Sequence, residues 1–442
     1  MPLPELIEII PPARPAPAQI TVPGSKSITN RALILAALGE GETILRGALW
    51  SEDTQVMVEC LQELGFMIHV APDPAEACNR TLTVYGKSGV VPPGGTASQP
   101  LELFVGNAGT AARFLTAFVC LGGGFYRLHG VPRMHERPQS ALFNALRELG
   151  YLVDAPTNKL PVVVRGAGPR PGQCRVSIDE SSQFASALLL GARRGQWNVS
   201  VEGANSEESP YVTMTAKLLE AFPSRGGQFE IEPDASSGSY FLAASYLLGT
   251  RRGRPSPSPA GSRTEPLQSP AVSVAAWPAS NWQVDSAFPS FLPLPDTLSR
   301  QSDLGDSILT AMVLAPFSDR PVRFTDLGRL RLQECERVVA FRDNLTRCGA
   351  KVAEAGDTLT FEPGAPLHGA EIETFNDHRV AMCFAILGLR VPGIRIQNPS
   401  CVKKTFPDFF QKLASSPPPG IHAAIRDATT GFALPPESLF AD

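Results

Sequence analysis

The chain has 442 residues, of which 43% are hydrophobic and 19% are charged, and its formal net charge is −4. This size predicts two domains, and the acidic balance excludes a nucleic-acid-coating protein, which would be strongly basic. No apolar run reaches the roughly 20 residues that a membrane helix needs. Residues 1–19 lack the basic start and apolar stretch of a signal peptide. We therefore expect a cytoplasmic protein that binds neither nucleic acid nor membrane.

The cysteines and histidines do not form a recognisable cluster in the sequence. All eight cysteines are scattered, and no two of them stand in a CxxC pair. The six histidines are dispersed as well. In a chain of this size that distribution is typical of reduced, buried thiols and not of a disulfide frame or a zinc site. The sequence therefore predicts no metal centre.

Two kinds of helix alternate along the chain. One kind is rich in alanine and leucine and apolar on nearly every side, so it should be buried. These helices begin near Asn30, Thr110, Gln183, Ser239, Ser307 and Arg379. The other kind has a single apolar stripe with helical spacing. These helices are predicted in Glu52–Phe66, Gln139–Gly150, Tyr211–Phe222, Glu334–Gly349 and Phe406–Leu413.

Short runs of alternating apolar and polar residues separate the helices and predict strands. Examples are Thr81–Tyr85, Leu160–Arg165, Phe229–Glu232 and Thr358–Phe361. The repeating unit is thus a strand and a buried helix, followed by a strand and an amphipathic helix. It recurs at intervals of about 55–80 residues, near the range typical of internal repeats. Six buried helices in two domains predict an α/β fold with three units per domain.

One segment breaks this repeat. An amphipathic helix is expected between Leu248 and Asp306, but residues 250–282 are rich in proline and serine, which do not form a regular helix. Two explanations remain open. Either the segment is a flexible, disordered insertion, or a sequencing or gene-model error has replaced a normal repeat without changing its length. We favour the second, because an insertion would add to the repeat and not take its place.

The first helix start carries a group of polar and cationic side chains. In PGSKSITNR, a Pro-Gly turn leads into a helix whose first residues include Lys26, Ser27 and Arg31. Free N–H groups and the helix dipole favour an anion at such a position. The GxxxxGK[ST] spacing of a P-loop is absent. A capped helix with surface cations remains the alternative interpretation of this motif.

Further motifs place similar side chains at later helix starts. In GNAGTAAR, Gly109 stands directly before a helix and lets a ligand approach the backbone. The other motifs are PRMHERP (132–138), SSQ (181–183), ECER (334–337), NDHR (376–379) and KKTFP (403–407). Each alone fits a capped helix or a solvated ion-pair cluster at least as well. If the helix starts converge, however, they form a positively charged cleft for a small molecule with several phosphate or carboxylate groups.

These motifs, in this order between about Ile20 and Leu413, resemble those of the 5-enolpyruvylshikimate-3-phosphate synthase family, the 3-phosphoshikimate 1-carboxyvinyltransferases. The resemblance implies an α/β fold of two similar domains, each with three βαβαββ repeats around buried helices. This is the enolpyruvyl transferase fold, an inside-out α/β barrel. It implies one domain at 25–235 and a second at 1–24 and 236–442, with the anomalous segment in the second.

The resemblance also implies the reaction. The enolpyruvyl group of phosphoenolpyruvate is transferred to the 5-hydroxyl of shikimate 3-phosphate, and phosphate is released, on the way to chorismate and the aromatic amino acids. The domains close on these two small molecules, no cofactor or metal is needed, and a monomer is expected. Paired carboxylates and a ring of cations suit this chemistry, because a tetrahedral intermediate forms and collapses with proton transfers.

Carried over by motif, the family's site residues fall into three groups. Those expected to hold phosphoenolpyruvate are Lys26, Gly109, Arg133, Gln183, Arg337, Arg379 and Lys404. Those expected to hold shikimate 3-phosphate are Ser27, Arg31, Ser181, Ser182, Asp306 and Gln333. The catalytic residues are Asp306, the base at the 5-hydroxyl, Glu334, the acid at the methylene carbon, and Lys26.

Several positions depart from the family pattern. Gln333 replaces the usual lysine, Arg329 an asparagine and His135 a common lysine. Glu208 replaces a phosphate-binding serine, which Ser209 could supply by a one-residue shift. Gln333 keeps a hydrogen-bond donor but loses a charge. We therefore expect weaker binding of shikimate 3-phosphate, or a repositioned site, and not a different reaction.

Two alternatives compete with this interpretation. Another enolpyruvyl transferase, acting on a nucleotide sugar, would lack the PRMxERP and NDHR patterns found here. A catalytically impaired, anion-binding relative would fit Gln333, Glu208 and the anomalous segment 250–282. Retention of Asp306, Glu334 and Lys26 argues against it.

Overall fold

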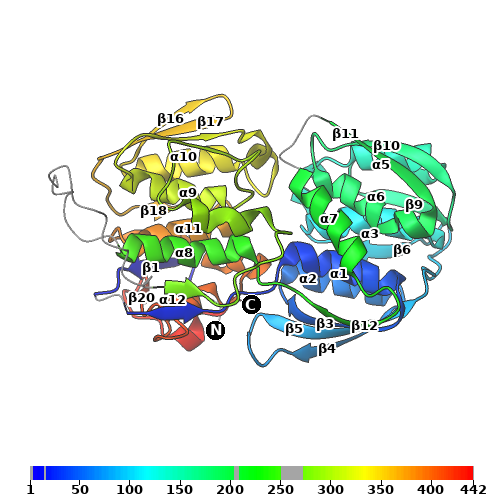
Figure 1. The fold of residues 1–442 in the computed structure, drawn as a ribbon, viewed down its shortest axis with the longest axis horizontal. Helices are drawn as coiled ribbons and strands as arrows, with labels where there is room; N and C mark the ends of the chain where they lie inside the picture. Colours follow the sequence, from blue (N-terminus) through cyan, green and yellow to red (C-terminus); the bar gives the residue numbers. More distant parts are fainter. Residues whose placement is uncertain (1–2, 14–15, 204–208, 250–271, 442) are drawn as a thin grey trace.

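The computed structural model describes residues 3–13, 16–203, 209–249 and 272–441. Two lobes lie side by side (Figure 1), and each has its own hydrophobic core. The core of the first lobe runs from Ile28 to Ile231. The core of the second combines Leu3–Val22 with residues 240–441. Among the helices of the described residues, none is long and apolar enough to cross a membrane.

Each lobe contains two four-stranded sheets and one two-stranded sheet among the described residues. The strands of the first lobe are β3 (Glu40–Leu49), β4 (Met67–Pro72), β5 (Asn79–Lys87), β6 (Leu101–Phe104), β7 (Gly123–His129), β8 (Leu152–Asp154), β9 (Val162–Ala167), β10 (Gly172–Ser177), β11 (Trp197–Glu202) and β12 (Gly227–Glu230). Those of the second are β1 (Leu6–Ile10), β2 (Ala18–Ile20), β13 (Val272–Val274), β14 (Thr297–Ser299), β15 (Val322–Thr325), β16 (Lys351–Ala355), β17 (Thr358–Glu362), β18 (Glu371–Ile372), β19 (Ile394–Gln397) and β20 (Ala424–Asp427).

The four larger sheets share one topology. Their strand orders are β12-β3-β5-β4, β6-β7-β9-β8, β14-β15-β17-β16 and β18-β19-β1-β20. In each, the first two strands are parallel and the remaining pairs are antiparallel. The two small sheets, β10-β11 and β13-β2, are parallel pairs. The predicted repeat is therefore confirmed: a parallel pair needs a crossover, which a helix supplies, and the antiparallel hairpin completes each unit.

All six predicted buried helices are present, three in each lobe. They are α1 (Lys26–Leu38), α3 (Gly109–Val119), α6 (Ser182–Gly195), α8 (Ala235–Gly249), α9 (Ile308–Leu314) and α11 (His378–Gly388). Every residue of α3 and α9 is buried, as is most of the others. These helices pack on one another inside each lobe, with the sheets around them (Figure 1). The fold is thus the α/β arrangement of helices inside sheets that the resemblance implies.

The predicted amphipathic helices are also present. They are α2 (Glu52–Glu63), α5 (Ser140–Glu148), α7 (Ser209–Ala221), α10 (Arg337–Arg347) and α12 (Phe409–Ala414), with the short α4 (Pro132–Glu136) before α5. α10 begins three residues later than the sequence predicts. Its N-cap is Glu336, whose carboxylate accepts the N–H of Val339. Glu334 therefore lies in a loop ahead of the helix.

The anomalous segment is partly described. Residues 250–271 lie outside the described residues. Residues 272–282 are ordered and begin with β13, which pairs with β2, because Val272 and Val274 have the strand pattern that the second core accepts. A disordered insertion therefore does not extend over these residues, and the explanation by a sequence error stays open. Trp277 packs on that core, and Trp282 stacks on Phe229 of the first lobe at 6.2 Å.

The chain crosses between the lobes twice, and the two crossings run side by side. Ser25 N–H donates to the carbonyl of Glu232, and Asp234 N–H to that of Pro23, both at 2.8 Å. Gly24 lies at this crossing, where a Cβ would come within 1.9 Å of the carbonyl oxygen of Gly47. Only glycine allows so close an approach. Directly after the crossings begin α1 and α8, so both helix starts face the junction of the lobes.

Candidate active site

A cavity lies between the lobes, and helix starts of both lobes line it. Eleven of the predicted site residues are among its lining residues. They are Lys26, Ser27, Arg31, Gly109, Ser181, Ser182 and Gln183 from the first lobe, and Asp306, Gln333, Glu334 and Arg379 from the second. The predicted convergence of the helix starts is therefore observed.

The other three predicted residues contact this lining. Arg133 Nη2 donates to the carbonyl of Gln333 at 3.0 Å, across the junction of the lobes. Arg337 Nη2 lies 2.8 Å from Glu334. Lys404 Nζ lies 3.3 Å from Asp53, a lining residue, and donates to the carbonyl of Asn107 at 3.0 Å, again across the junction. The predicted phosphoenolpyruvate residues are thus close neighbours, although they come from both lobes.

Asp53 joins two of the predicted lysines, and sequence reasoning missed it. Its carboxylate lies 2.8 Å from Lys26 Nζ and 3.3 Å from Lys404 Nζ, so one acid bridges cations of different lobes. Burial by itself would raise the pKa of Asp53, but the two ammonium groups lower it below its usual range. In the sequence Asp53 stands in the first turn of α2, where an acidic residue interacts favourably with the helix dipole. That common role gave no reason to assign Asp53 to the site.

Asp306 lies among guanidinium groups. The distances from its carboxylate oxygens are 2.9 Å to Arg379, 3.5 Å to Arg300 and 3.9 Å to Arg337. Burial acts to raise the pKa of Asp306, but these three guanidinium groups together hold it well below its usual range. Asp306 is therefore ionised at neutral pH and can accept a proton.

Glu334 is ionised for a similar reason. Its carboxylate lies 2.8 Å from Arg337 and 4.0 Å from Lys404 Nζ. Burial acts to raise the pKa of Glu334, but Arg337 first and Lys404 second lower it well below its usual range. The site without ligands thus holds two carboxylates, both charged, within reach of the same arginine.

Asp377 orients Arg337, the arginine that lies within reach of both Asp306 and Glu334. This carboxylate is fully buried and accepts from Arg337 Nε at 2.7 Å and Nη2 at 3.2 Å. It also caps α11, because Oδ1 accepts the N–H of Arg379 at 2.9 Å. Asp377 therefore orients two predicted phosphoenolpyruvate residues at once. The NDHR motif contains it, but its role depends on the distant Arg337.

Arg31 makes more protein contacts than the resemblance implies. Its Nε donates to Thr215 Oγ1 at 2.7 Å, and its Nη2 to Ser186 Oγ at 3.0 Å. It also donates to the carbonyl of Ser27, one turn earlier in α1. Arg31 is buried and lines the cavity, so it can tie α1, α6 and α7 together and still face a ligand.

The departures from the family pattern occupy distinct places. Gln333 lies in the cavity: its Nε2 is 3.5 Å from Asp306, and its side-chain oxygen accepts from Arg337. Arg329 also lines the cavity and donates to the carbonyl of Asp179 of the opposite lobe at 3.0 Å. His135 accepts the N–H of Gly130 at 3.1 Å and is not among the lining residues. Glu208 lies outside the described residues.

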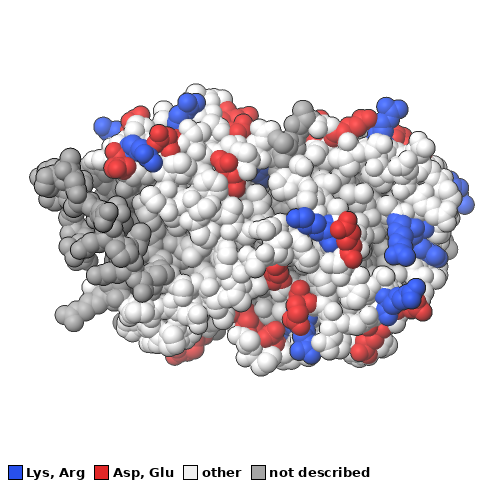
Figure 2. All heavy atoms as spheres, in the orientation of Figure 1, with Lys and Arg blue, Asp and Glu red and all other residues white. Residues whose placement is uncertain are grey.

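The cavity is less one-sidedly basic than the helix starts alone predict. Seven cationic and six acidic side chains line it, and several of the cations are already paired with the acids described above. On the outer face that Figure 2 draws, acidic and basic side chains are interspersed. The strong electrostatic interactions therefore lie inside the cavity, where charges are desolvated and act strongly on one another.

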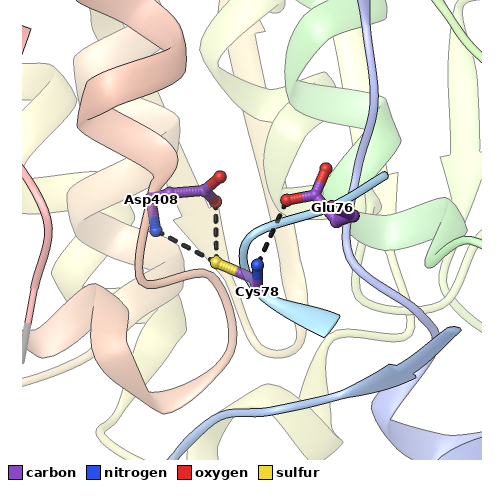
Figure 3. A group of neighbouring side chains, drawn as sticks. All are labelled: Glu76, Cys78 and Asp408. Carbon is purple, nitrogen blue, oxygen red and sulfur yellow. Dashed lines mark hydrogen bonds between the residues drawn. The ribbon is translucent and has the colours of Figure 1, made fainter. Parts of the chain in front are cut away.

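A separate buried group lies at the junction of the lobes. Ligand atoms of Glu76, Cys78 and Asp408 lie within 4.8 Å of one another, an arrangement that could hold a metal ion (Figure 3). Lys412 Nζ, however, lies 2.7 Å from Glu76 and 3.3 Å from Asp408. Its ammonium group already supplies the positive charge that a metal would bring, so the group is held together as an ion-pair network.

Comparison with known proteins identifies the family. The sequence model of the family described as EPSP synthase (3-phosphoshikimate 1-carboxyvinyltransferase) matches residues 11–225 and 300–413. A 3-phosphoshikimate 1-carboxyvinyltransferase from Nostoc sp. (strain PCC 7120) is 37% identical over 432 residues, covering 90% of this chain and 96% of that protein. The enzyme of the same name from Opitutus terrae is 36% identical over 450 residues, covering 94% and 98%.

Solved structures show the same fold. An EPSP synthase from Acinetobacter baumannii superposes with a TM-score of 0.70 and 19% identity, covering 95% of this chain and 99% of that one. The enolpyruvyl transferase NikO from Streptomyces tendae superposes with a TM-score of 0.65 and 15% identity, covering 98% and 100%. At these identities the likeness concerns the fold alone, whereas the sequence matches decide the family. The chain belongs to the EPSP synthase (3-phosphoshikimate 1-carboxyvinyltransferase) family.

Proposed function

We propose that the chain transfers the enolpyruvyl group of phosphoenolpyruvate to the 5-hydroxyl of shikimate 3-phosphate and releases phosphate, as a transferase of aromatic amino-acid biosynthesis. The observation that carries this proposal is one cavity in which helix starts of both lobes surround two ionised carboxylates, Asp306 and Glu334, with cations. Membership of the family supplies the reaction. Both substrates are anions, which such a cavity suits.

The proposed binding residues follow the motifs and fit the observed neighbourhoods. Phosphoenolpyruvate is held by Lys26, Gly109, Arg133, Gln183, Arg337, Arg379 and Lys404, which all line the cavity or contact its lining. Shikimate 3-phosphate is held by Ser27, Arg31, Ser181, Ser182, Asp306 and Gln333. Both sets contain residues of both lobes, so the two substrates bind where the lobes meet.

Asp306 is the proposed base. The 5-hydroxyl of shikimate 3-phosphate adds to C2 of the enol, its proton passes to Asp306, and C3 gains a proton to give a tetrahedral intermediate. C3 then loses a proton, and the bond from C2 to the phosphate oxygen breaks. A carboxylate that is charged before substrate arrives can accept the first proton, and the low pKa of Asp306 keeps it in this charged form.

Glu334 is the proposed acid that protonates C3. Because its pKa is low, Glu334 is ionised in the site without ligands and must take up a proton before it can donate one. Phosphoenolpyruvate brings anionic groups that compete with Glu334 for Arg337 and Lys404, and this competition raises the pKa of Glu334 in the complex. Substrate binding thereby prepares the acid, while Lys26 and the other cations stabilise the departing phosphate.

The proposal also covers the domain limits, the oligomeric state and the localisation of the protein. The domains comprise residues 25–235, and 1–24 with 236–442; the two separate cores support these limits. The proposed partners are the two small-molecule substrates, and the proposed oligomeric state is a monomer. The protein is cytoplasmic, which the eight free cysteines of the described residues support, because reducing compartments preserve thiols.

A phosphate-release assay with both substrates tests the proposal. We expect phosphate only when both substrates are present, and a loss of about 10²–10⁴-fold in kcat for Asp306→Asn and Glu334→Gln. Asp296→Asn, which changes an exposed carboxylate outside the cavity, is the matched control and should leave the rate unchanged. If both substrates bind but no phosphate appears, the protein is the impaired anion-binding relative instead.

A further inference from the structure

Asp285 is a buried carboxylate whose two oxygens are surrounded by hydrogen-bond donors. It lies near the start of the 3-10 helix η2 (Val284–Phe291), is 3% exposed and lines the cavity between the lobes. Its Oδ1 accepts the N–H of Gly305 at 2.7 Å and the hydroxyl of Ser307 at 2.6 Å. The N–H of Ser307 lies 3.3 Å from both oxygens, and Oδ2 accepts the hydroxyl of Ser236. These contacts hold the carboxylate in one position.

The donors that Asp285 accepts flank Asp306 in the chain. Gly305 and Ser307 directly precede and follow Asp306, so one carboxylate holds the backbone on both sides of the proposed base. The approach is close, because a Cβ built on Gly305 would lie 2.9 Å from a methyl carbon of Val284 and 3.2 Å from Asp285 Oδ1. Both flanking residues are buried, where an N–H that loses its acceptor is costly. The placement of Asp306 therefore depends on Asp285.

The same segment also holds the crossing between the lobes. Gln283, two residues before Asp285, is 6% exposed. Its Oε1 accepts the N–H of Ala235 at 3.0 Å, and its Nε2 donates to the carbonyl of Pro233 at 2.8 Å. Ser236, which donates to Asp285, is the next residue along this crossing. The segment is thus bonded on one side to the crossing and on the other to the backbone around the proposed base.

The contacts of Asp285 fit a positioning role and not that of a second base. A carboxylate has about four lone-pair directions. The hydroxyl and N–H of Ser307, the N–H of Gly305 and the hydroxyl of Ser236 occupy them. The described structure therefore leaves Asp285 no lone pair for a substrate hydroxyl. Burial raises the pKa of Asp285, and the hydroxyl groups of Ser236 and Ser307 oppose this shift because they bond to the ionised form.

We propose that Asp285 is a positioning residue for Asp306: it holds the backbone of Gly305 and Ser307 and ties it to the crossing between the lobes. This inference rests on the proposed function, in which Asp306 takes the proton of the 5-hydroxyl. Displacing a catalytic group by about 1 Å can lower a rate by about 10²-fold. Because Asp285 acts on the base and not on the binding of either substrate, it should control kcat and leave both KM values unchanged.

Steady-state kinetics with both substrates test this role. In Asp285→Ala the flanking N–H groups lose their acceptor, so we expect kcat to fall at least about tenfold while both KM values stay within about twofold. Asp285→Asn should restore most of the kcat, since its carbonyl oxygen can replace Oδ1 and its amide can donate to the hydroxyl of Ser236. Asp285→Ser, whose hydroxyl is one bond short of the donors, carries the same expectation as Asp285→Ala and replaces it if that variant does not fold.

A matched control lies in the same loop. Asp303 accepts the N–H of Ser299 at 2.8 Å and is not among the described residues that line the cavity. Asp303→Ala also removes a carboxylate that holds the backbone, but it should leave kcat unchanged. An unchanged kcat in both Asp285→Ala and Asp285→Ser, or a KM increase that accounts for the loss, overturns the positioning role.

A double variant tests whether Asp285 acts through Asp306. In the Asp306→Asn background, Asp285→Ala should lower kcat by less than about twofold more, because a base that has been removed cannot be displaced. A further loss as large as that of Asp285→Ala alone would show that Asp285 acts on another group and would overturn the proposal.

Hydrogen exchange separates this inference from the proposed function, because it needs no turnover. The peptide that contains Gly305 and Ser307 should exchange at least about tenfold faster in Asp285→Ala than in wild type, and close to the wild-type rate in Asp285→Asn. If wild-type protein fails to turn over the two substrates yet shows this pattern, the proposed function fails and the positioning of Asp306 stands. Unchanged exchange in both Asp285→Ala and Asp285→Ser, or an acceleration that extends equally over β15 and β17, overturns it.

Discussion

The thiol of Cys78 donates a hydrogen bond of 2.8 Å to the carboxylate of Asp408, a residue 330 positions further along the chain (Figure 3). Cys78 directly precedes β5 of the first lobe and Asp408 directly precedes α12 of the second, so the bond crosses their junction. Burial raises the pKa of Cys78, and the thiol therefore stays protonated and able to donate. Glu76 and Lys412 extend this contact, with 2.7 Å between their charged groups.

This junction predicts a pH-dependent contribution to stability. Burial raises the pKa of Asp408 to about 6, although Lys412 opposes the shift. Because the folded pKa lies above the unfolded value, the contribution is complete below about pH 4 and is lost as the pH rises through about 6. Relative to wild type, Asp408→Asn should therefore gain about 2–3 kcal/mol in free energy of unfolding between pH 4 and pH 7.

Urea unfolding of both proteins at pH 4, 5, 6 and 7 measures this difference. Glu76 has the opposite sign, because its pKa is lowered, and it interacts directly with Asp408, so the comparison reports the titration of this pair. Asp154→Asn, an exposed carboxylate of β8, serves as the control and should show no such slope. A difference between Asp408→Asn and wild type that stays constant with pH would contradict the predicted titration.

Asp377→Asn should weaken both the fold and substrate binding. The variant removes the charge that holds Arg337 at 2.7 Å, and breaking a buried ion pair costs about 3–5 kcal/mol. Asparagine can still cap α11, so the helix start should remain. We expect a lower free energy of unfolding and a raised KM for phosphoenolpyruvate. Asp343→Asn, whose ion pair with Arg342 lies on the surface, should cost less than about 1 kcal/mol. Equal losses in the two variants would count against a positioning role.

Gln333→Lys tests whether the departure from the family pattern weakens shikimate 3-phosphate binding. Gln333 lies 3.5 Å from Asp306 and contacts Arg337, so a lysine there would face the ionised Asp306 and the incoming substrate. We expect a lower KM for shikimate 3-phosphate, by about tenfold for one added charge-assisted hydrogen bond. Steady-state kinetics with shikimate 3-phosphate varied measures it. An unchanged KM, or a loss of activity, would show that the site has adapted to glutamine.

Gly109→Ala should impair phosphoenolpyruvate binding and spare the fold. Its Cβ would approach Arg113 Nη1 to 2.7 Å, and the far end of a flexible side chain can move aside. Alanine also suits a helix better than glycine. We expect a KM for phosphoenolpyruvate raised by about tenfold, at an unchanged melting temperature. Gly123→Ala meets nothing within 4 Å and should leave both quantities as in wild type; a matching KM in the two variants would refute the predicted clash.

The sequence predicted the elements well because their signals are local. The apolar periodicity that distinguishes α3 from α2, and the alternation that marks β17, are properties of about ten consecutive residues. The glycine and cationic residues at the helix starts are equally local, and they identified the family. The late start of α10 was missed, because capping by Glu336 competes with a helical pattern that extends back to Glu334.

The partners of those side chains were decided only by the tertiary structure. Asp53 appears in the sequence as a residue of an ordinary helix first turn, yet it bridges Lys26 and Lys404, which are 378 positions apart. Arg113 appears as one more residue of an apolar helix, and only its environment shows that its buried Nε and Nη1 have no hydrogen-bond partner in the described part of the chain. Periodicity fixes which face of an element is buried. Which charges then meet across two lobes depends on how the lobes pack, and no pattern within a single segment encodes that.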